Sequence, residues 1–375
     1  MTNPCRRRLA AAALALGAAV AAGTALGVPA HAATTGGIAT AYKLTLIKAG
    51  TIAGAETDVF GINNNGEIFG TGDLAGQTKG FVQPAGASTA TFLGQPSDAA
   101  SFSIPFPEMI NNNGDVVGSF ITNSIDNPTH PIEWPGGTTP TDLDPLVEKA
   151  TGIDGGTDKT VANGINDHGL IVVEATEGSF ADGVTIQGST VTKLPGLPGG
   201  GGAAGSTNSN PIAVNNNNLI VGSAINSAGN EVAAEWQNGK ITALGGLPGS
   251  SQTEALAVNS SGLAVGASIS ATDLNEHAVE FVNGNVIDLK VPGETNNDAQ
   301  AKAVNDSNVI VGGDGNGNAF AFASGQSVDL NTLIPAGSGV TLTIANGINS
   351  NGVIVGDATI TSTGQHVGFE LTPVS

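Results

Sequence analysis

The sequence alternates short apolar runs with polar turns, and one ten-residue phrase of this kind recurs along it. In AVNSSGLAVG, which begins at Ala257, a run of small apolar residues leads into an Asn-x-x-Gly turn, and a second apolar run follows. Six related phrases begin at Gly61, Met109, Gly164, Ala213, Ala303 and Gly347. Asn can bond its own backbone, and Gly accepts the left-handed conformation of a tight turn. Each phrase therefore predicts a hairpin of two strands.

The hairpins recur with the period of a known repeat architecture. The first Asn of each phrase lies at position 63, 111, 166, 215, 259, 305 or 349, so successive phrases are 48, 55, 49, 44, 46 and 44 residues apart. Periods of this length are typical of the four-stranded blades of a β-propeller. Seven phrases therefore predict seven blades.

The fifth unit illustrates the four strands that we expect in each blade. Small and apolar residues alternate over 254–259, and a second apolar run covers 263–268 after the turn. Two further alternating runs cover 277–282 and 285–290, and Asn283-Gly284 separates them. Asn-Gly in this position predicts a two-residue hairpin turn, because both residues accept positive φ. The first strand of each blade should line a central channel, where only small side chains are expected to fit.

These patterns predict an all-β fold, a seven-bladed β-propeller of four-stranded blades. The main helical pattern is a single turn at 145–150. The seventh unit lacks a fourth strand, and AYKLTLI at 41–47 has the pattern of one, so we expect the N-terminal strand to join the last blade and close the ring. One propeller domain is expected over 33–375, with units near 53–95, 104–145, 158–195, 208–245, 252–290, 299–334 and 341–373 plus 40–49.

The first 32 residues predict a secretory signal peptide rather than a part of the fold. A basic stretch at 6–8 precedes a small apolar segment, and Ala30-His31-Ala32 fits a cleavage site. The alternative is a membrane anchor, which is disfavoured because the segment is rich in Ala and short for a span. We therefore expect a secreted protein, extracellular or periplasmic, with no membrane span in the mature chain.

Cleavage at this site would change what the composition allows. The single cysteine, Cys5, would be removed, which excludes disulfides and thiolate chemistry from the mature chain. Loss of three arginines and no acid would take the formal net charge from −20 to −23. So acidic a chain repels phosphate backbones, which excludes nucleic acid as a partner. Solubility is the simplest consequence of the charge.

A second pattern follows the turn phrase in each unit. It includes His277-Ala278-Val279-Glu280-Phe281 and His130-Pro131-Ile132-Glu133-Trp134. With GINNNGEIFG and AVNSSGLAVG, these segments resemble a bacterial extracellular repeat family named for its His-Ala-Phe (HAF) signature. The resemblance implies a β-propeller-like extracellular protein without an established activity. The other five units have a different residue in place of the signature His: Lys79, Asp182, Val232, Asn318 and Val367. The signature His is therefore not a shared catalytic group.

Candidate catalytic chemistry is sparse. The sequence has no G-x-S-x-G nucleophile motif, and His130, His168 and His277 lack the spacing of metal ligands. His168 fits a solvated turn residue, and we assign no catalytic and no cofactor-binding residue. Trp134 and Trp236 share a third-strand position, which predicts packing between blades rather than a platform for sugar rings.

A ligand site is expected at the propeller face that carries the long loops. Four acidic residues are predicted to follow second strands there, near the channel mouth: Asp73, Glu174, Asp314 and Asp357. In the segment 314–318, Asp314, Asn316 and Asn318 place oxygen atoms at alternate positions, as calcium loops do, although the later bidentate Glu is missing. These three residues are a calcium candidate, and an ordinary exposed turn is the alternative.

The sequence therefore predicts a monomeric, non-catalytic propeller that acts as a binding or structural module outside the cytoplasm. Its expected partner is an extracellular protein or a polysaccharide, and calcium is the one cofactor considered. The alternative is a carbohydrate-active enzyme, a glycoside hydrolase or lyase, that uses paired carboxylates at the channel mouth. Such an enzyme needs a concave pocket with two carboxyl groups about 5–9 Å apart and aromatic walls.

Overall fold

The computed structural model describes residues 37–50, 56–97, 99–100, 103–122, 129–137, 139–153, 159–177, 180–202, 206–271, 275–291 and 298–374. All of them belong to one unit, Thr34–Ser375, and the predicted signal peptide lies outside them. The described chain is all-β, as predicted. Its helical elements are α1 (Asp144–Thr151) and short 3-10 turns at Pro135–Gly137 and Leu330–Thr332.

Most strands form antiparallel sheets of four, in which strands that follow one another along the chain lie side by side. The first such sheet contains β2 (Asp58–Ile62), β3 (Ile68–Leu74), β4 (Gln77–Gln83) and β5 (Thr91–Phe92). Three later sheets repeat this order: β14 (Ser209–Val214), β15 (Ile220–Ile225), β16 (Glu231–Gln237) and β17 (Lys240–Gly245); β18 (Ser250–Val258), β19 (Ala264–Ser270), β20 (Glu276–Val282) and β21 (Asn285–Asp288); β22 (Gln300–Val304), β23 (Ile310–Gly313), β24 (Ala319–Ala323) and β25 (Gln326–Asp329).

One larger sheet contains two further series of four strands. The first is β6 (Phe106–Ile110), β7 (Val116–Ile121), β8 (Thr129–Trp134) and β9 (Thr141–Asp142); the second is β10 (Lys159–Ile165), β11 (Leu170–Glu177), β12 (Phe180–Gln187) and β13 (Thr190–Lys193). A single parallel register pair, Lys159 opposite Thr129, joins the two series. Each series is otherwise an antiparallel meander like those of the other sheets.

The last sheet combines the two ends of the described chain. Its strands, in spatial order, are β1 (Tyr42–Ile47), β28 (His366–Pro373), β27 (Ile354–Ile360) and β26 (Val340–Ile348). β1 is antiparallel to β28, with Tyr42 opposite Pro373 and Ile47 opposite Gly368. The N-terminal strand therefore supplies the outer strand of the sheet that ends the chain.

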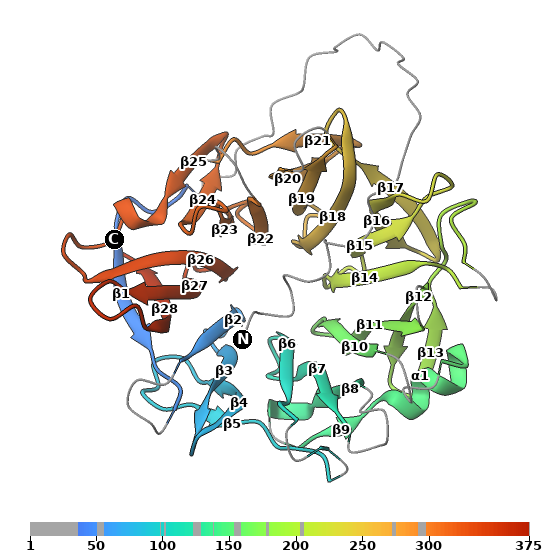
Figure 1. Ribbon diagram of the computed structural model, residues 1–375, viewed down its shortest axis with the longest axis horizontal. Helices are drawn as coiled ribbons and strands as arrows, with labels where there is room; N and C mark the ends of the chain where they lie inside the picture. The colour runs from blue at the N-terminus through green and yellow to red at the C-terminus, as the bar shows by residue number, and fades with distance from the viewer. Residues whose placement is uncertain are drawn as a thin grey trace. The chain divides into compact units, whose positions relative to one another are not determined.

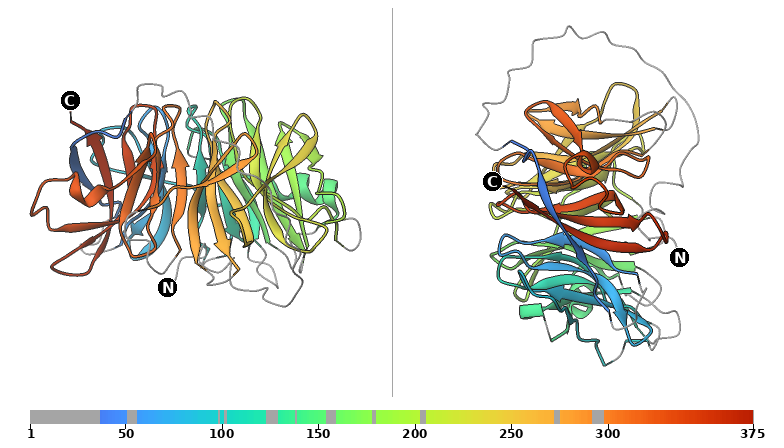
Figure 2. Two further views of the ribbon diagram at one scale, coloured as in Figure 1. Left: turned by 90° about the horizontal axis from the view of Figure 1, so that it is seen from above. Right: turned by 90° about the vertical axis from the view of Figure 1, so that its left-hand side faces the viewer.

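The sheets follow one another around a common axis, and Figure 1 shows this propeller-like arrangement. The first strand of each series lies nearest the centre: β2, β6, β10, β14, β18, β22 and β26. Figure 2 shows the same sheets from the side. The turn from the first to the second strand is short, whereas the connections that enter the first strands are longer, except the one that enters β18.

Each innermost strand carries a β-bulge at the same point, three residues before the repeated Asn. The bulged residues are half-buried: Phe60, Glu108, Asn163, Ile212, Leu256, Lys302 and Asn346. Several of these side chains are large. The expectation that only small side chains fit along the innermost strands is therefore wrong at this position.

The glycine that ends most of the second apolar runs lies beside the bulge. A Cβ atom would overlap the carbonyl oxygen of the innermost strand of the same hairpin at six positions: Gly70, Gly118, Gly222, Gly266, Gly312 and Gly356. The close approach therefore occurs within one sheet, between the two strands of the hairpin. The third hairpin has Val173 at this register, and nothing in the structure explains how the carbonyl is avoided there.

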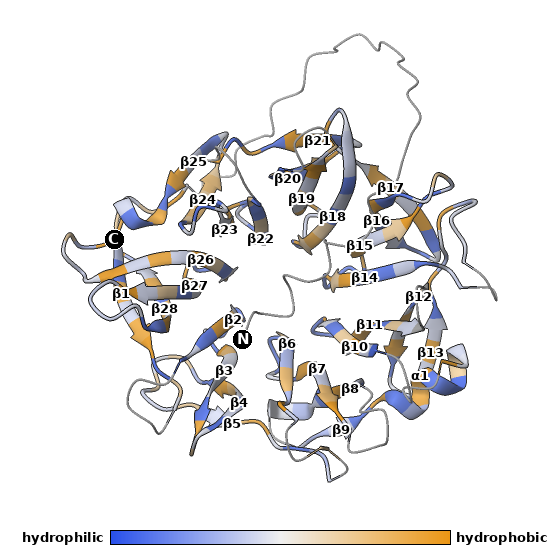
Figure 3. Ribbon diagram, viewed as in Figure 1, coloured by the Kyte–Doolittle hydropathy of each residue, from blue (hydrophilic) through white to orange (hydrophobic). Residues whose placement is uncertain are grey.

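The apolar core lies between neighbouring sheets, and Figure 3 shows apolar residues on strands around the whole ring. Trp134 and Trp236 are 0% and 1% exposed. Their indole Nε1 atoms donate to the backbone oxygens of Gly94 (2.7 Å) and Pro195 (2.8 Å), which follow the outer strands of the preceding series. The predicted packing of both tryptophans between blades is confirmed.

The helix α1 is longer than the single turn predicted from 145–150. Proline at its first turn fits the helix start, and the helix ends at Gly152, whose φ of 74° is left-handed and whose N–H donates to Glu148 O. No helix among the described residues has the length and apolar character needed to cross a membrane.

Candidate functional site

The repeated asparagines form a ring of hydrogen bonds at one end of the innermost strands. The Nδ2 of each donates to the backbone oxygen of the next, at 2.8–3.3 Å, and the last donates to the first. We call these residues the asparagine ring: Asn63, Asn111, Asn166, Asn215, Asn259, Asn305 and Asn349. Each is at most 7% exposed. The ring therefore links every innermost hairpin to its neighbour.

The same side chains also hold their own turns. Asn215 Oδ1 accepts hydrogen bonds from the backbone N–H groups of Asn217 (2.9 Å) and Leu219 (3.0 Å), and each turn of the ring has an equivalent pair. The left-handed position is Gly in five turns and Asn in two, at Asn218 (φ 58°) and Asn308 (φ 59°). The predicted turn role of Asn and Gly is confirmed. The bond from each Asn to the next hairpin was not predicted.

A second layer of side chains strengthens this end of the molecule. The residue after a ring asparagine often accepts a hydrogen bond from the equivalent backbone N–H of the preceding hairpin, as Asn216 Oδ1 does from Asp167 N (2.9 Å). Asp167 also accepts bonds from the backbone and side chain of Asn112 (both 2.8 Å) and from the side chain of Asn216 (2.7 Å). Burial alone would raise the pKa of Asp167, but these bonds outweigh it and lower the pKa. The polar groups at the asparagine-ring end of the strands hydrogen-bond one another, and these bonds join neighbouring hairpins.

The signature position links the third and fourth strands of its sheet. In three units a basic and an acidic side chain lie close together there: His130 with Asp142 (3.0 Å), His277 with Asp288 (3.7 Å) and, with the positions exchanged, Asp182 with Lys193 (2.6 Å). Exchange of the two charges preserves attraction between strands but would not preserve the chemistry of a histidine. The position therefore has a structural role. His168 is exposed in its turn, as expected.

Three of the four acidic residues predicted near the channel mouth are placed differently along their strands than expected. Asp73, Glu174 and Asp357 lie within the second strands β3, β11 and β27, not after them. Asp73 Oδ1 accepts a hydrogen bond from Gly76 N (3.1 Å), and Glu174 Oε1 accepts one from Thr176 Oγ1 (3.4 Å). The carboxylates of Asp73 and Glu174 therefore bond groups of their own sheets.

The calcium candidate forms a compact turn between β23 and β24. Asp314 is 3% exposed, and its Oδ1 accepts hydrogen bonds from the backbone N–H groups of Asn316 (2.8 Å) and Asn318 (2.9 Å). Its Oδ2 accepts a bond from Asn318 Nδ2 (2.9 Å). Across the described ranges, no group of three or more His, Cys, Asp or Glu residues is arranged to hold a metal ion. The hydrogen bonds account for these three residues as parts of a turn.

Asp357 joins the last sheet to the first. Its Oδ1 accepts a hydrogen bond from Val59 N (2.8 Å), and its Oδ2 accepts one from Asn346 Nδ2 (3.0 Å). Asn346 Nδ2 also donates to Val59 O (2.8 Å). Burial, with a smaller effect of the nearby Asp58, raises the pKa of Asp357 to about 7 despite these hydrogen bonds.

Glu276 is a second carboxyl group with a raised pKa, and it is 4% exposed at the start of β20. Its Oε1 accepts a hydrogen bond from Gln300 Nε2 (2.8 Å) of the next sheet. Burial, with a smaller effect of Asp298, raises the pKa of Glu276 to about 7, against opposing effects of Gln300 and Lys302. Glu276 therefore holds a proton up to neutral pH in the folded protein.

The raised pKa of Glu276 predicts a stability that falls as the pH rises. Between about pH 4.5 and 7 the folded state retains a proton that the unfolded state releases, so the free energy of unfolding decreases with pH over this range. Glu276→Gln should keep the acceptor for Gln300 and should be more stable than the wild type by about 3 kcal/mol at pH 8, but by little at pH 4.5. Urea denaturation at both pH values measures this difference. Glu148→Gln, on the exposed surface of α1, is the control and should change neither value.

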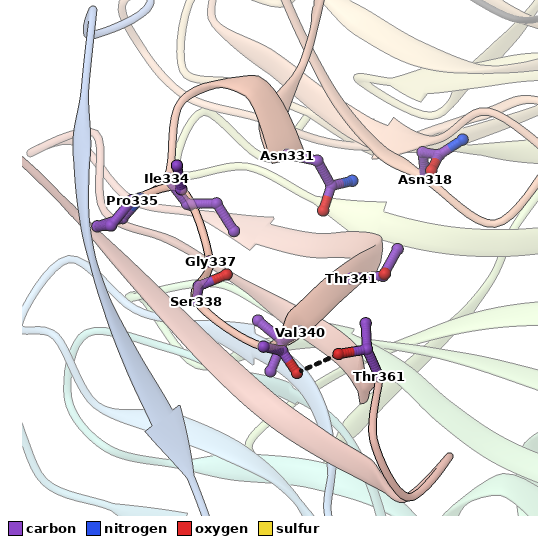
Figure 4. A pocket seen from close by; sticks show the side chains of 11 residues that line it. Asn318, Asn331, Ile334, Pro335, Gly337, Ser338, Val340, Thr341 and Thr361 are labelled. Atoms are coloured by element: carbon purple, nitrogen blue, oxygen red, sulfur yellow. Dashed lines mark hydrogen bonds between the residues drawn. The ribbon is translucent and has the colours of Figure 1, made fainter.

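A pocket of about 550 Å³ lies at the loop end of the last two sheets, opposite the asparagine ring along β26 (Figure 4). Its walls are the connection 334–339, the start of β26 at Val340 and Thr341, and the side chains of Asn318, Asn331 and Thr361. None of its 11 lining residues is acidic, basic or aromatic. The pocket therefore lacks the paired carboxylates and aromatic walls that the enzyme alternative requires.

Of the residues that line this pocket, only Asn318 was predicted from the sequence as a candidate ligand residue. The others are small polar or apolar residues in a connection that contains Pro335, Gly337 and Gly339. Such a composition is typical of any exposed loop. No signal in the sequence distinguishes this connection as the wall of a pocket.

Comparison with protein-family models finds no match, and comparison with curated proteins finds none either. Similar solved structures include the extracellular domain of a one-component system from B. thetaiotaomicron, at 11% identity and TM-score 0.48, covering 88% of this chain and 40% of that one. YCF48 bound to D1 peptide matches at 10% identity and TM-score 0.47, covering 92% of this chain and 99% of that one. TolB from Acinetobacter baumannii matches at 12% identity and TM-score 0.37, covering 68% and 65%. These likenesses are too distant to argue from, so the fold assignment rests on the strand pairing of the chain itself.

Proposed function

We propose that this chain is an exported, seven-bladed β-propeller that acts as a non-catalytic binding or structural module outside the cytoplasm. Seven turn phrases, seven bulged innermost strands and a seven-membered asparagine ring support the blade count. The pairing of β1 with β28 supports closure through the last blade. Membership in the His-Ala-Phe repeat family and export through residues 1–32 are parts of the same proposal and rest on the sequence alone.

The observation that carries the non-catalytic proposal is the neutral lining of the pocket at the loop end. A glycosidase needs two carboxyl groups on either side of the bond that it cleaves, one of them able to donate a proton. Asp357 and Glu276 have raised pKa values, but their carboxyl groups bond the backbone or side chains of neighbouring sheets. Neither residue lines the pocket. The carboxyl groups thus serve the packing of the sheets.

A thermal melt of the purified protein with additives tests this proposal. EDTA, excess calcium and a panel of polysaccharide fragments are added separately, because a ligand bound only by the folded state raises the midpoint. The same samples are analysed for new reducing ends or unsaturated products. A binding module gives a midpoint shift without products, and a structural module gives neither. Cleavage of any fragment overturns the proposal in favour of the enzyme alternative. A shift with calcium that EDTA reverses supports the site at 314–318.

A further inference from the structure

The pocket at the loop end has walls that are fixed before any ligand binds. Asn331 bonds the backbone of Leu342 in both directions: Leu342 N donates to its Oδ1 (2.8 Å), and its Nδ2 donates to Leu342 O (3.0 Å). On the opposite wall, the N–H and the Oγ1 of Thr361 both donate to Gly339 O (both 2.9 Å). These bonds fix Asn331, which precedes the connection 334–339, against β26, and fix Gly339, at its end, against the β27–β28 turn. Such preorganisation reduces the entropy lost on binding.

The groups that remain available in the pocket are hydroxyls beside a short apolar strip. Ser338 and Thr341 make no side-chain hydrogen bond within the described part of the chain, so their hydroxyls can donate and accept. Ile334, Pro335 and Val340 supply the apolar surface. Figure 4 shows these side chains around a common space. The pocket therefore offers both apolar contact and uncharged hydrogen bonding.

This chemistry selects against ions. An anionic ligand would find no cationic side chain in the pocket and would be repelled by a chain of formal net charge −20. A cationic ligand would find no carboxylate there, so its charge would be desolvated without a partner. An extended peptide is disfavoured as well, because peptide recognition usually uses an exposed strand edge. β26 is the inner edge strand of its sheet, but beside the pocket the backbone N–H and carbonyl of Leu342 already bond the side chain of Asn331.

We infer that the pocket binds an uncharged saccharide, with room for about one or two sugar rings in a volume typical of small-ligand sites. The C–H face of a ring packs on Ile334, Pro335 and Val340, and ring hydroxyls exchange hydrogen bonds with Ser338 and Thr341. Without an aromatic platform the affinity is modest, with a Kd on the order of 1 mM. This inference rests on the proposed function and adds a ligand class to it.

Saturation-transfer NMR titrations of the purified protein test the inference. The probes are maltotriose, cellotriose and tri-N-acetylchitotriose, with trigalacturonate as the charged analogue and triglycine amide, acetylated, as a neutral peptide. At least one neutral saccharide should bind, and trigalacturonate should bind at least about tenfold more weakly. The double variant Ser338→Ala, Thr341→Val should raise the Kd of that saccharide about fivefold or more. Thr190→Val, an exposed threonine on β13, is the control and should leave the Kd unchanged.

The outcomes separate this inference from the proposed function. Binding of no neutral saccharide, binding that the double variant leaves unchanged, or binding of the peptide instead overturns the pocket assignment while the non-catalytic module stands. Binding followed by release of shorter saccharides overturns the non-catalytic proposal while the pocket assignment stands. A melting midpoint of the double variant close to that of the wild type shows that a weaker Kd reflects lost contacts rather than unfolding.

Discussion

Replacing Asn215 with alanine should lower the free energy of unfolding by about 4 kcal/mol. The side chain makes three hydrogen bonds, one partly buried and two buried: its Oδ1 accepts from Asn217 N and from Leu219 N, and its Nδ2 donates to Asn259 O. Alanine leaves all three backbone groups without these partners in a site where Asn215 is only 7% exposed. An unsatisfied buried polar group costs about 1–3 kcal/mol. Urea denaturation followed by circular dichroism measures the loss.

Two further variants separate the roles of the amide group. Asn216→Ala removes an exposed neighbour that bonds Asp167, and should cost less than about 1 kcal/mol. Asn215→Asp keeps the acceptor for the turn but replaces the donor to Asn259 O with an oxygen, so it should destabilise nearly as much as alanine. If Asn215→Asp is as stable as the wild type, the bond between hairpins contributes nothing. If Asn215→Ala costs no more than Asn216→Ala, the asparagine ring has no special role.

From the repeated phrase alone, the turn that each ring asparagine holds can be predicted, but its bond to the next hairpin cannot. A local rule suffices for the turn, because the residues that Asn215 Oδ1 binds lie two and four positions away. The Nδ2 partner lies 44 residues away in the next hairpin. Its identity depends on which hairpins are neighbours and on how their ends align, and no local pattern encodes that alignment.

The bulge in each innermost strand could not be predicted for a similar reason. Its residue is Leu256 in one strand, Lys302 in another and Asn346 in a third, so no residue type marks it. The alternation of small residues on either side is compatible with a regular strand. In six of the seven hairpins a glycine on the partner strand lies beside the bulge, and this signal can be recognised only when the register is known.

Candidate ligand residues were harder to predict than strands. Asp314 and Asp357 were selected because they were predicted to follow second strands near the channel mouth, yet their oxygens accept backbone N–H bonds. A sequence gives the position of a carboxylate but not the direction of its hydrogen bonds. The pocket depends instead on Ser338 and Thr341, whose types are common in exposed connections. Only the fold of the connection 334–339 makes them wall residues.

The second large effect should follow from Gly266→Ala, which we expect to lower the free energy of unfolding by about 4 kcal/mol or to prevent folding. A Cβ atom at this position overlaps Glu254 O and also lies 3.0 Å from Ala255 Cα, both in the paired strand β18. A backbone carbonyl cannot move aside as a flexible side chain can, so the hairpin must shift against the sheets on both sides. Overpacking of a close-packed core already costs about 1–3 kcal/mol where side chains can adjust.

Gly239→Ala is the matched control, because that glycine has a left-handed φ of 73° but open space around it, with no heavy atom within 4 Å of the place that a Cβ would take. It should cost about 1 kcal/mol, the usual penalty of a side chain in this conformation. Equal losses for the two variants would mean that β18 relaxes easily around the added methyl group. The comparison of the two losses is informative because the third hairpin has Val173 at the register that Gly266 occupies in the fifth. Val173 is fully buried. A large loss at Gly266 would then mean that the third hairpin accommodates valine through changes elsewhere in its own strands, and that the other hairpins depend on glycine.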